Sequence, residues 1–299
     1  MQTMRNRIKY SQNFLKNSQL VKSLVGRSDI SLNDTVYEIG AGEGIITKVL
    51  LEKAGKVVAF ELDRSLFDKL DKKFKNNKSL ELKFEDFSVS TLPDYPYKVF
   101  SNIPFNITSK IIKKLTLEDN PPTNAYLIVQ KEAAARFAGK PLDNKNSQLS
   151  VILNPWFEFR VIHKFKAGDF FPKPSVEIVL LEIKQRNKFM IDSKNKDEYE
   201  DFVVYTFNQF KPNIAKGLSK IFSRQDISGL AKMVGFSQNS KPSELNFNDW
   251  VSLFNLFLNM PEKKYSLVKG SFAKQLGQQK NIKKISRTRI DKNWRQYGH

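Results

Sequence analysis

The stretch TVYEIGAGEG, residues 35–44, decides the fold of this chain. Its β-branched and aromatic residues predict a strand. Its three alternate glycines predict a tight turn in which the backbone can pass close to a ligand. The apolar residues that follow, from Ile45 to Ala54, predict a helix. A strand, a glycine turn and a helix in this order form a typical first unit of an α/β sheet.

The same alternation of strand and helix continues along the chain. Strands are predicted at 56–62, 80–86, 97–102 and 126–130, and helices at 64–75, 107–115 and 131–137. Two further strands, at 157–163 and 177–183, have no helix pattern between them, so we expect them to pair antiparallel at the end of the sheet. We therefore predict an α/β protein with a Rossmann-like, mostly parallel and doubly wound sheet.

The composition changes near residue 187, where four helix patterns follow one another at 199–210, 214–222, 227–234 and 248–258. They predict a small all-helical C-terminal domain. The expected organisation is a basic N-terminal arm with a capping helix (1–27), a catalytic domain (28–186), a helical domain (187–260) and a basic, flexible tail (261–299).

The positive charge of the chain is concentrated at its two ends. The 299 residues carry 50 Lys and Arg against 31 Asp and Glu, a net charge of +19. Residues 1–27 contain six basic and no acidic residues, and residues 261–299 contain eleven basic and two acidic residues. Basic arms on a nearly neutral body indicate a protein that binds nucleic-acid phosphates; a solvated tail that only aids solubility is the alternative.

Several classes of function are disfavoured by what the sequence lacks. There is no cysteine, and the two histidines are His163 and His299, so we expect neither disulfides nor a metal site. No stretch approaches the ~20 apolar residues that span a bilayer. We expect a cytoplasmic protein, a monomer, without a membrane partner.

The carboxyl ends of the predicted parallel strands carry the candidate binding residues, namely Gly40, Glu61, Asp86 and Asn102. Ligands of doubly wound sheets bind beyond these ends. The spacing at Gly40 and Gly42 is G-x-G-x-G, with Ile45 where the dinucleotide fingerprint has its third glycine, so a pyrophosphate site is disfavoured. Glu38 and Glu43 would repel phosphates but tolerate a cation such as the sulfonium of S-adenosylmethionine. A nucleotide phosphate site and a purely structural turn are the alternatives.

Other residues at the strand ends suit the parts of a nucleoside. Glu61 can accept hydrogen bonds from both ribose hydroxyls. Asp86 can accept one from an adenine amine while Phe87 packs on the ring. The motif Asn102-Ile103-Pro104-Phe105 combines an amide, a rigid backbone and a flat aromatic face directly after a strand. The alternatives are a plain turn and a strand-end Asp without a ligand.

Together with these motifs, QNFL (12–15), QKE (130–132) and FFPKPSV (170–176) complete a series that resembles the rRNA adenine N6-methyltransferase family over residues 8–260. The family has an Erm branch, which modifies 23S rRNA and confers macrolide-lincosamide-streptogramin B resistance, and a KsgA branch, which modifies small-subunit rRNA during ribosome assembly. The turn Asn-Ile-Pro-Phe is similar to the Erm branch, whereas the other branch usually has Asn-Leu-Pro-Tyr.

The resemblance implies a class I methyltransferase fold, S-adenosyl-L-methionine as cofactor and rRNA as partner, with protein-free or precursor 23S rRNA favoured. The residues that it assigns to the cofactor are Gln12, Asn13, Leu15, Gly40, Gly42, Glu61, Asp86, Phe87 and Asn102. On the acceptor side, the Asn102 oxygen and the Ile103 carbonyl would accept the two N6 hydrogens of an extruded adenine, next to the rigid Pro104. Phe105 and Phe170 would stack on that base; a plain core position is the alternative for Phe170.

Two other functions stay open at this point. One is a KsgA-type dimethyltransferase of small-subunit rRNA. The other is a nucleic-acid-binding protein that keeps the fold without activity, against which the joint presence of Glu61, Asp86 and Asn102 argues.

Overall fold

A seven-stranded mixed sheet forms the centre of the computed structural model, which describes residues 13–281. The strand order is β4-β3-β2-β5-β6-β9-β7. The strands of this sheet are β2 (Thr35–Ile39), β3 (Lys56–Phe60), β4 (Leu80–Lys83), β5 (Lys98–Asn102), β6 (Asn124–Gln130), β7 (Phe157–Lys164) and β9 (Ile178–Gln185). The first five run parallel, and β9 pairs antiparallel with both β6 and β7. The predicted α/β class and the antiparallel terminal pair are confirmed.

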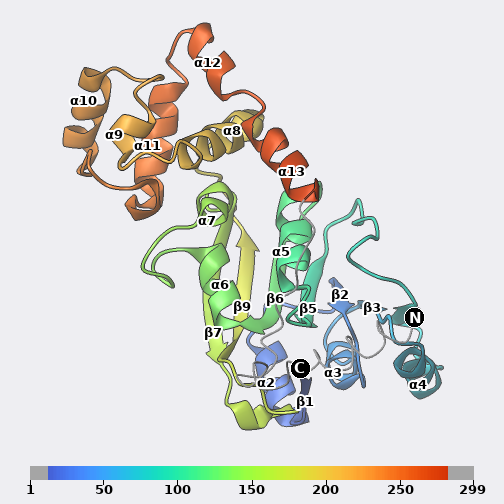
Figure 1. The fold of residues 1–299 in the computed structure, drawn as a ribbon. Helices are drawn as coiled ribbons and strands as arrows, with labels where there is room; N and C mark the ends of the chain where they lie inside the picture. The colour runs from blue at the N-terminus through green and yellow to red at the C-terminus, as the bar shows by residue number, and fades with distance from the viewer. Residues whose placement is uncertain (1–12, 282–299) are drawn as a thin grey trace, which may run out of the picture.

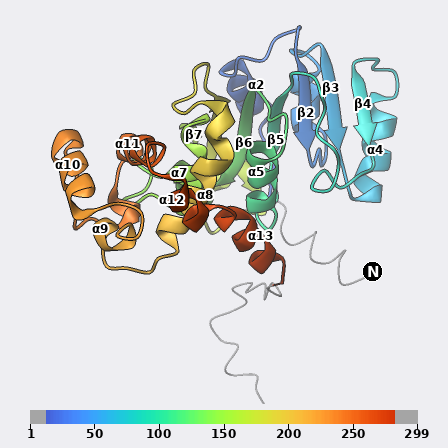
Figure 2. The same ribbon diagram turned by 90° about the horizontal axis from the view of Figure 1, so that it is seen from above.

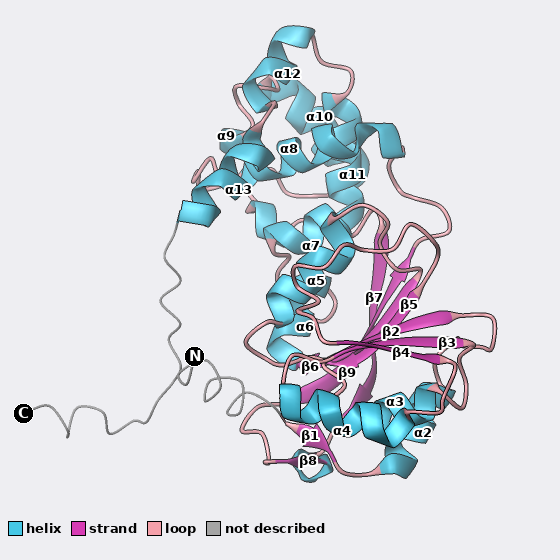
Figure 3. Cartoon of the chain, turned by 90° about the vertical axis from the view of Figure 1, so that its right-hand side faces the viewer, coloured by secondary structure: helices cyan, strands magenta, loops and turns pink. Residues whose placement is uncertain are grey.

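Helices cover both faces of this sheet (Figures 1 and 3). On one face, α2 (Ser18–Gly26), α3 (Ile45–Leu50) and α4 (Arg64–Phe74) share an apolar core with the residues of the sheet that point toward them. On the other, α5 (Thr108–Leu117), α6 (Lys131–Ala138) and α7 (Gln148–Leu153) share a second core. Burying both faces in this way explains why the central strands read as continuous apolar runs.

The helical part continues the second of these cores without a break. It contains α8 (Lys196–Phe207), α9 (Ile214–Gly217), α10 (Arg224–Val234) and α11 (Phe247–Phe257), so the four predicted helices are present. Aromatic rings join α8 to α11: Phe202 stacks on Phe257 at 4.9 Å, and Phe207 stacks on Trp250 at 5.4 Å. Seen from above, this part lies beside the β7 end of the sheet, away from β4 (Figure 2).

The chain after Pro261 differs from the predicted flexible tail. It forms α12 (Glu262–Val268) and α13 (Ser271–Asn281). Tertiary contacts explain the difference: Tyr265 packs on Phe257 at 4.6 Å, Val268 is buried, and the Asp201 carboxylate accepts hydrogen bonds from the backbone N–H groups of Gly270 and Phe272. The rest of the predicted tail, 282–299, and the first part of the predicted arm, 1–12, lie outside the described residues.

Two smaller differences concern local structure. The strand predicted at 80–86 ends at Lys83, so Asp86 lies in the turn after the strand. A two-stranded sheet that the patterns did not predict joins β1 (Phe14–Leu15) to β8 (Phe170–Phe171). Within residues 13–281, none of the helices combines the length and the apolar character needed to span a membrane.

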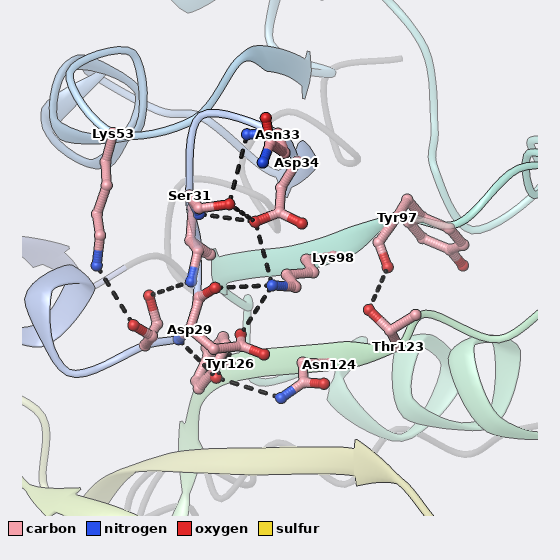
Figure 4. Close-up of polar contacts among 12 residues, drawn as sticks. Asp29, Ser31, Asn33, Asp34, Lys53, Tyr97, Lys98, Thr123, Asn124 and Tyr126 are labelled. Carbon is pink, nitrogen blue, oxygen red and sulfur yellow. Dashed lines mark hydrogen bonds and ion pairs between the residues drawn. The ribbon is translucent and has the colours of Figure 1, made fainter. Parts of the chain in front are cut away.

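A polar network at the amino ends of the strands anchors the segment that connects α2 to β2 (Figure 4). The Lys98 ammonium contacts the Asp29 carbonyl at 2.7 Å and the Asp34 carboxylate at 3.1 Å. The Tyr126 hydroxyl donates to the Asp29 carboxylate at 2.9 Å and accepts from the Asn124 amide at 3.3 Å. This network holds the end of α2 against β5 and β6. At the other end, Asn17 caps the start of α2, so both ends of the helix that follows the arm are held in place.

Candidate active site

The glycine turn lies between β2 and α3, at the carboxyl edge of the sheet. Gly40 and Gly42 have positive φ values of 76° and 59°, a conformation that side chains disfavour. A Cβ atom on Gly42 would lie 3.1 Å from the ring of Phe14, which approaches from the arm. The turn is therefore shaped both by its backbone conformation and by the arm that covers it.

The buried carboxylate of Glu61 holds this turn in place. One oxygen accepts a hydrogen bond of 2.8 Å from the N–H of Gly42, and the other accepts bonds of 2.8 Å from the N–H groups of Leu62 and Asp63. A carboxylate has about four acceptor positions. Three are thus in use, so a ligand with two hydroxyls would have to exchange with at least one of these backbone donors.

Glu61 also lines a cavity that suits a flat ring. Its other walls include the apolar side chains of Phe60, Phe87 and Ile107, with Asp86 at its edge. Phe87 is 2% exposed and meets Phe60 edge-on at 5.0 Å, so it forms part of the cavity wall. One Asp86 oxygen accepts from the N–H of Ser88 at 2.8 Å. The cavity thus combines apolar walls with carboxylate acceptors, which fit the ring, the amine and the hydroxyls of an adenosine and need no phosphate site.

A second cavity adjoins the first, and the two share Gly40 and Pro104. The arm residues Asn13, Phe14 and Leu15 line it on one side, and Asn102 to Phe105 line it on the other. Except for Phe170, each described residue that was predicted for the site thus lines one of the two joined cavities. Gln12, also predicted, lies outside the described residues.

The side chain of Asn102 is oriented by the arm. Its amide nitrogen donates a hydrogen bond of 2.7 Å to the backbone carbonyl of Asn13. Because a carbonyl can only accept, this contact assigns the amide nitrogen to the arm side and turns the amide oxygen to the opposite side. The arm is itself held, since the side chain of Asn13 donates to the Pro172 carbonyl at 2.7 Å.

The remaining residues of the Asn-Ile-Pro-Phe turn are held by the backbone. The N–H of Ile103 donates to the Ile128 carbonyl at 3.1 Å, and the Pro104 carbonyl accepts from the N–H of Ile107 at 3.0 Å. Ile103 is buried, whereas Phe105 is half-buried against the core on the α2 side. The aromatic ring therefore sits at the wall of the second cavity, as its position in the motif predicts.

Phe170, predicted as a second stacking face, does not offer one in this structure. It is fully buried and packs on Phe165 at 5.2 Å, while the next residue, Phe171, is 67% exposed. Successive residues of a strand point to opposite sides. Pairing of Phe170 with Leu15 and of Phe171 with Phe14 decides which of the two faces the core.

Glu38 lies beneath the glycine turn and lines the second cavity. Its carboxyl group is 1% exposed and accepts a hydrogen bond of 2.6 Å from the Thr47 hydroxyl. Burial raises the pKa of Glu38 to about 8, although the hydrogen bonds from Thr47 oppose this change. The group is therefore mostly neutral at pH 7, and a cation placed nearby would favour its ionised form.

Three contributors were not predicted from the sequence. Phe14 covers the turn, the Ser101 hydroxyl accepts from the N–H of Ile39 at 2.7 Å, and the Pro172 carbonyl anchors the arm. For Ser101, its position directly before Asn102 on β5 is the only sequence feature that indicates a place in the site. Among the described residues, no group of three or more His, Cys, Asp or Glu side chains is arranged to hold a metal ion.

The sheet and the joined cavities at its carboxyl edge have the Rossmann-like arrangement of the methyltransferase fold. The family model described as "Ribosomal RNA adenine dimethylase" matches residues 3–259, and the chain belongs to this family. It is therefore an S-adenosylmethionine-dependent rRNA adenine N6-methyltransferase, and the family inferred from the sequence motifs is confirmed.

Relatives from both branches are similar to this chain. It is 30% identical over 254 residues to an rRNA adenine N-6-methyltransferase of Bacteroides fragilis, and the aligned region covers 84% of this chain and 94% of the relative. It is also 30% identical over 249 residues to ribosomal RNA small subunit methyltransferase A of Mesomycoplasma hyopneumoniae, and this aligned region covers 83% of this chain and 95% of the relative. The crystal structure of the 23S rRNA methyltransferase ErmE shares its fold, with a TM-score of 0.76 and 24% identity over 83% of this chain and 100% of that chain.

Proposed function

We propose that this enzyme methylates N6 of an adenine in 23S rRNA and thereby confers macrolide-lincosamide-streptogramin B resistance. The observation that carries the chemistry is the position of Asn102, whose oriented amide lines the second cavity next to the arm. The choice of 23S rRNA rests on Phe105 in the Asn-Ile-Pro-Phe turn, which is similar to the Erm branch.

The residues of the first cavity, Glu61, Asp86 and Phe87, would hold the adenosine of the cofactor, and the glycine turn and the arm would hold its methionine part. Asp86 would accept from the adenine amine, and Glu61 would accept from the ribose. S-adenosylmethionine supplies a methyl group on a positively charged sulfur. Glu38, buried under the turn, favours that positive charge when it is ionised.

On the acceptor side, the adenine amine is a poor nucleophile because its lone pair is delocalised into the ring. The Asn102 oxygen and the Ile103 carbonyl accept the two N6 hydrogens and draw the nitrogen toward a tetrahedral geometry that frees the lone pair. The target base must be unpaired or extruded to reach them. Phe105 supplies a stacking face, so that positioning is the main contribution of the protein.

A second candidate target is small-subunit rRNA. It is supported by the similarity to ribosomal RNA small subunit methyltransferase A of Mesomycoplasma hyopneumoniae, at the same 30% identity as the Bacteroides fragilis relative. Both functions use the same residues and differ only in the RNA that reaches them.

The experiment that separates the two candidates uses the purified full chain with radiolabelled S-adenosylmethionine. Protein-free 23S rRNA and protein-free 16S rRNA are offered in parallel reactions. Label in 23S rRNA alone is the expected result, and label in 16S rRNA alone would establish the second candidate. Label in neither RNA would contradict both.

A further inference from the structure

A groove between the end of α8 and α13 has the chemistry of a nucleobase site, although it lies outside the joined cavities described above. Its α13 wall, Ser271–Asn281, follows the residues that the family model matches, which end at 259. This wall thus lies beyond the part of the chain that matches the family model.

Side-chain amides dominate the lining of this groove, which we call the α8–α13 groove. They belong to Gln148, Asn208, Gln209, Gln275 and Gln278, and Lys274 is the one charged residue among the described lining residues. A neighbouring hollow between α8 and α12 is lined instead by four carboxylates, those of Asp197, Glu198, Asp201 and Glu262. Amides present donors and acceptors together, which is what the edges of nucleobases require. Of these two hollows, the α8–α13 groove is the one compatible with an RNA strand.

Phe210, another lining residue of the α8–α13 groove, offers its ring to solvent. It is 91% exposed, the largest exposure recorded for a large apolar side chain in the described part of the chain. Its φ is 50°, in the left-handed region that residues other than Gly, Asn and Asp rarely adopt. Lys211 follows it directly. An exposed aromatic ring in an unfavourable backbone conformation, next to a cation, suits stacking on a base.

The groove is also preorganised. The side chains of Gln148 and Gln275 donate hydrogen bonds to each other, at 3.2 Å and 2.6 Å, and the Asn208 amide donates to Gln275 at 3.0 Å. These bonds join α13 to the start of α7 and to the end of α8. The α13 wall is thus held both by α7, which packs on the sheet, and by the helical part. Because the wall is already ordered, a ligand can bind without the entropic cost of ordering it.

We propose that the α8–α13 groove binds an unpaired nucleobase of the RNA substrate. The base stacks on Phe210, the amides of the groove bond to its edge, and Lys211 and Lys274 contact the neighbouring phosphates. Structured RNA is recognised largely through such unpaired bases and through its backbone. The identity of the partner as RNA rests on the proposed function.

The test measures binding of the full chain to two fluorescein-labelled probes by anisotropy. One is a 12-nucleotide oligoadenylate, and the other is an abasic ribose-phosphate strand of the same length. Phe210→Ala should weaken oligoadenylate binding about 5- to 100-fold and leave the abasic strand unaffected. Met233→Ala, at a 77% exposed apolar residue of α10 outside the groove, should change neither.

A second variant reports the contact directly. In Phe210→Trp, the added indole fluorescence should be quenched by oligoadenylate and not by the abasic strand. The proposal would be overturned if Phe210→Ala bound oligoadenylate as tightly as the parent, or if both strands quenched Phe210→Trp equally. A protein partner would then be the next occupant of the groove to test. Transfer of label to neither rRNA, together with a persistent effect of Phe210, would refute the proposed function but not the groove.

Discussion

The side-chain amide of Asn102 donates a hydrogen bond to the backbone carbonyl of Asn13, a residue 89 positions earlier in the chain. This bond joins the acceptor motif at the end of β5 to the N-terminal arm. It leaves the amide oxygen of Asn102 directed away from the arm, so a contact far apart in sequence orients the group that we assign to the target amine.

Asn102→Ala should abolish most of the methyl transfer. Removing one preorganised hydrogen-bond donor of an oxyanion hole costs about 100- to 1000-fold in kcat, and we expect a loss of the same order for this acceptor. Asn102→Asp should also be impaired, because its carboxylate cannot donate to the Asn13 carbonyl. Single-turnover transfer from labelled S-adenosylmethionine to rRNA measures both, and the exposed Asn33→Ala is the matched control. Parental activity of Asn102→Ala would refute the proposed amine contacts.

Asn13→Ala should have a smaller effect, because the backbone carbonyl that orients Asn102 remains. The variant loses the hydrogen bond from the Asn13 side chain to the Pro172 carbonyl. A hydrogen bond contributes about 0.5–1.5 kcal/mol, so we expect a loss of about 2- to 10-fold in kcat/KM. A loss as large as that of Asn102→Ala would instead indicate that the side chain of Asn13 itself contacts the cofactor or the target.

Gly42→Ala should weaken cofactor binding and destabilise the fold. The new methyl group would lie 3.1 Å from the Phe14 ring, at a φ of 59°. The left-handed conformation alone costs about 1–2 kcal/mol for a residue with a Cβ atom. Calorimetry with S-adenosylmethionine and urea unfolding measure the two effects. Gly26→Ala is the control, since it lies in α2 with no atom within 4 Å of the added Cβ; equal effects of the two variants would contradict the explanation.

The pKa of Glu38 predicts a pH dependence of stability. Its pKa in the folded protein is about 8, above its ordinary value of 4.5, because the group is buried. The folded state therefore retains the proton between these values, while the unfolded state releases it. The contribution to stability is greatest below pH 4.5 and is lost as pH rises through 8.

Glu38→Gln should remove this dependence. Urea unfolding of the parent between pH 5 and pH 8.5 should show a free energy of unfolding that falls relative to that of the variant as pH increases. An unchanged difference across this range would show that Glu38 ionises in the folded state as it does in the unfolded chain.

Phe105→Tyr should keep the activity of the parent, whereas Phe105→Ala should not. Stacking requires a flat face and no hydroxyl, and a base stacked on an aromatic ring gains about 1–3 kcal/mol. The loss in Phe105→Ala should appear in kcat/KM for rRNA, with the affinity for S-adenosylmethionine less affected. If Phe105→Ala acts as the parent does, another ring supplies the stacking, and the 67% exposed Phe171 is the next to test.

Much of the fold and the site could be predicted because the signals are local. A glycine with positive φ, an apolar run and a helical repeat each depend on a few neighbouring residues, so the residues from Thr35 to Gly44 already specify a strand, a turn and the start of a helix. Parallel strands then bring their carboxyl ends to one edge, which places Gly40, Glu61 and Asn102 together.

Other features required the tertiary structure, because they depend on residues that are far apart in the chain. The pairing of β1 with β8 decides that Phe170 is buried and Phe171 exposed. The Asp201 carboxylate caps the start of α13, so that a stretch with few apolar residues of its own becomes helical. The sequence by itself determined the chemistry available at the sheet edge, through residue types and spacing. The fold decided how the arm orients Asn102 and where α13 forms a groove, since both follow from hydrogen bonds between segments that only folding brings together.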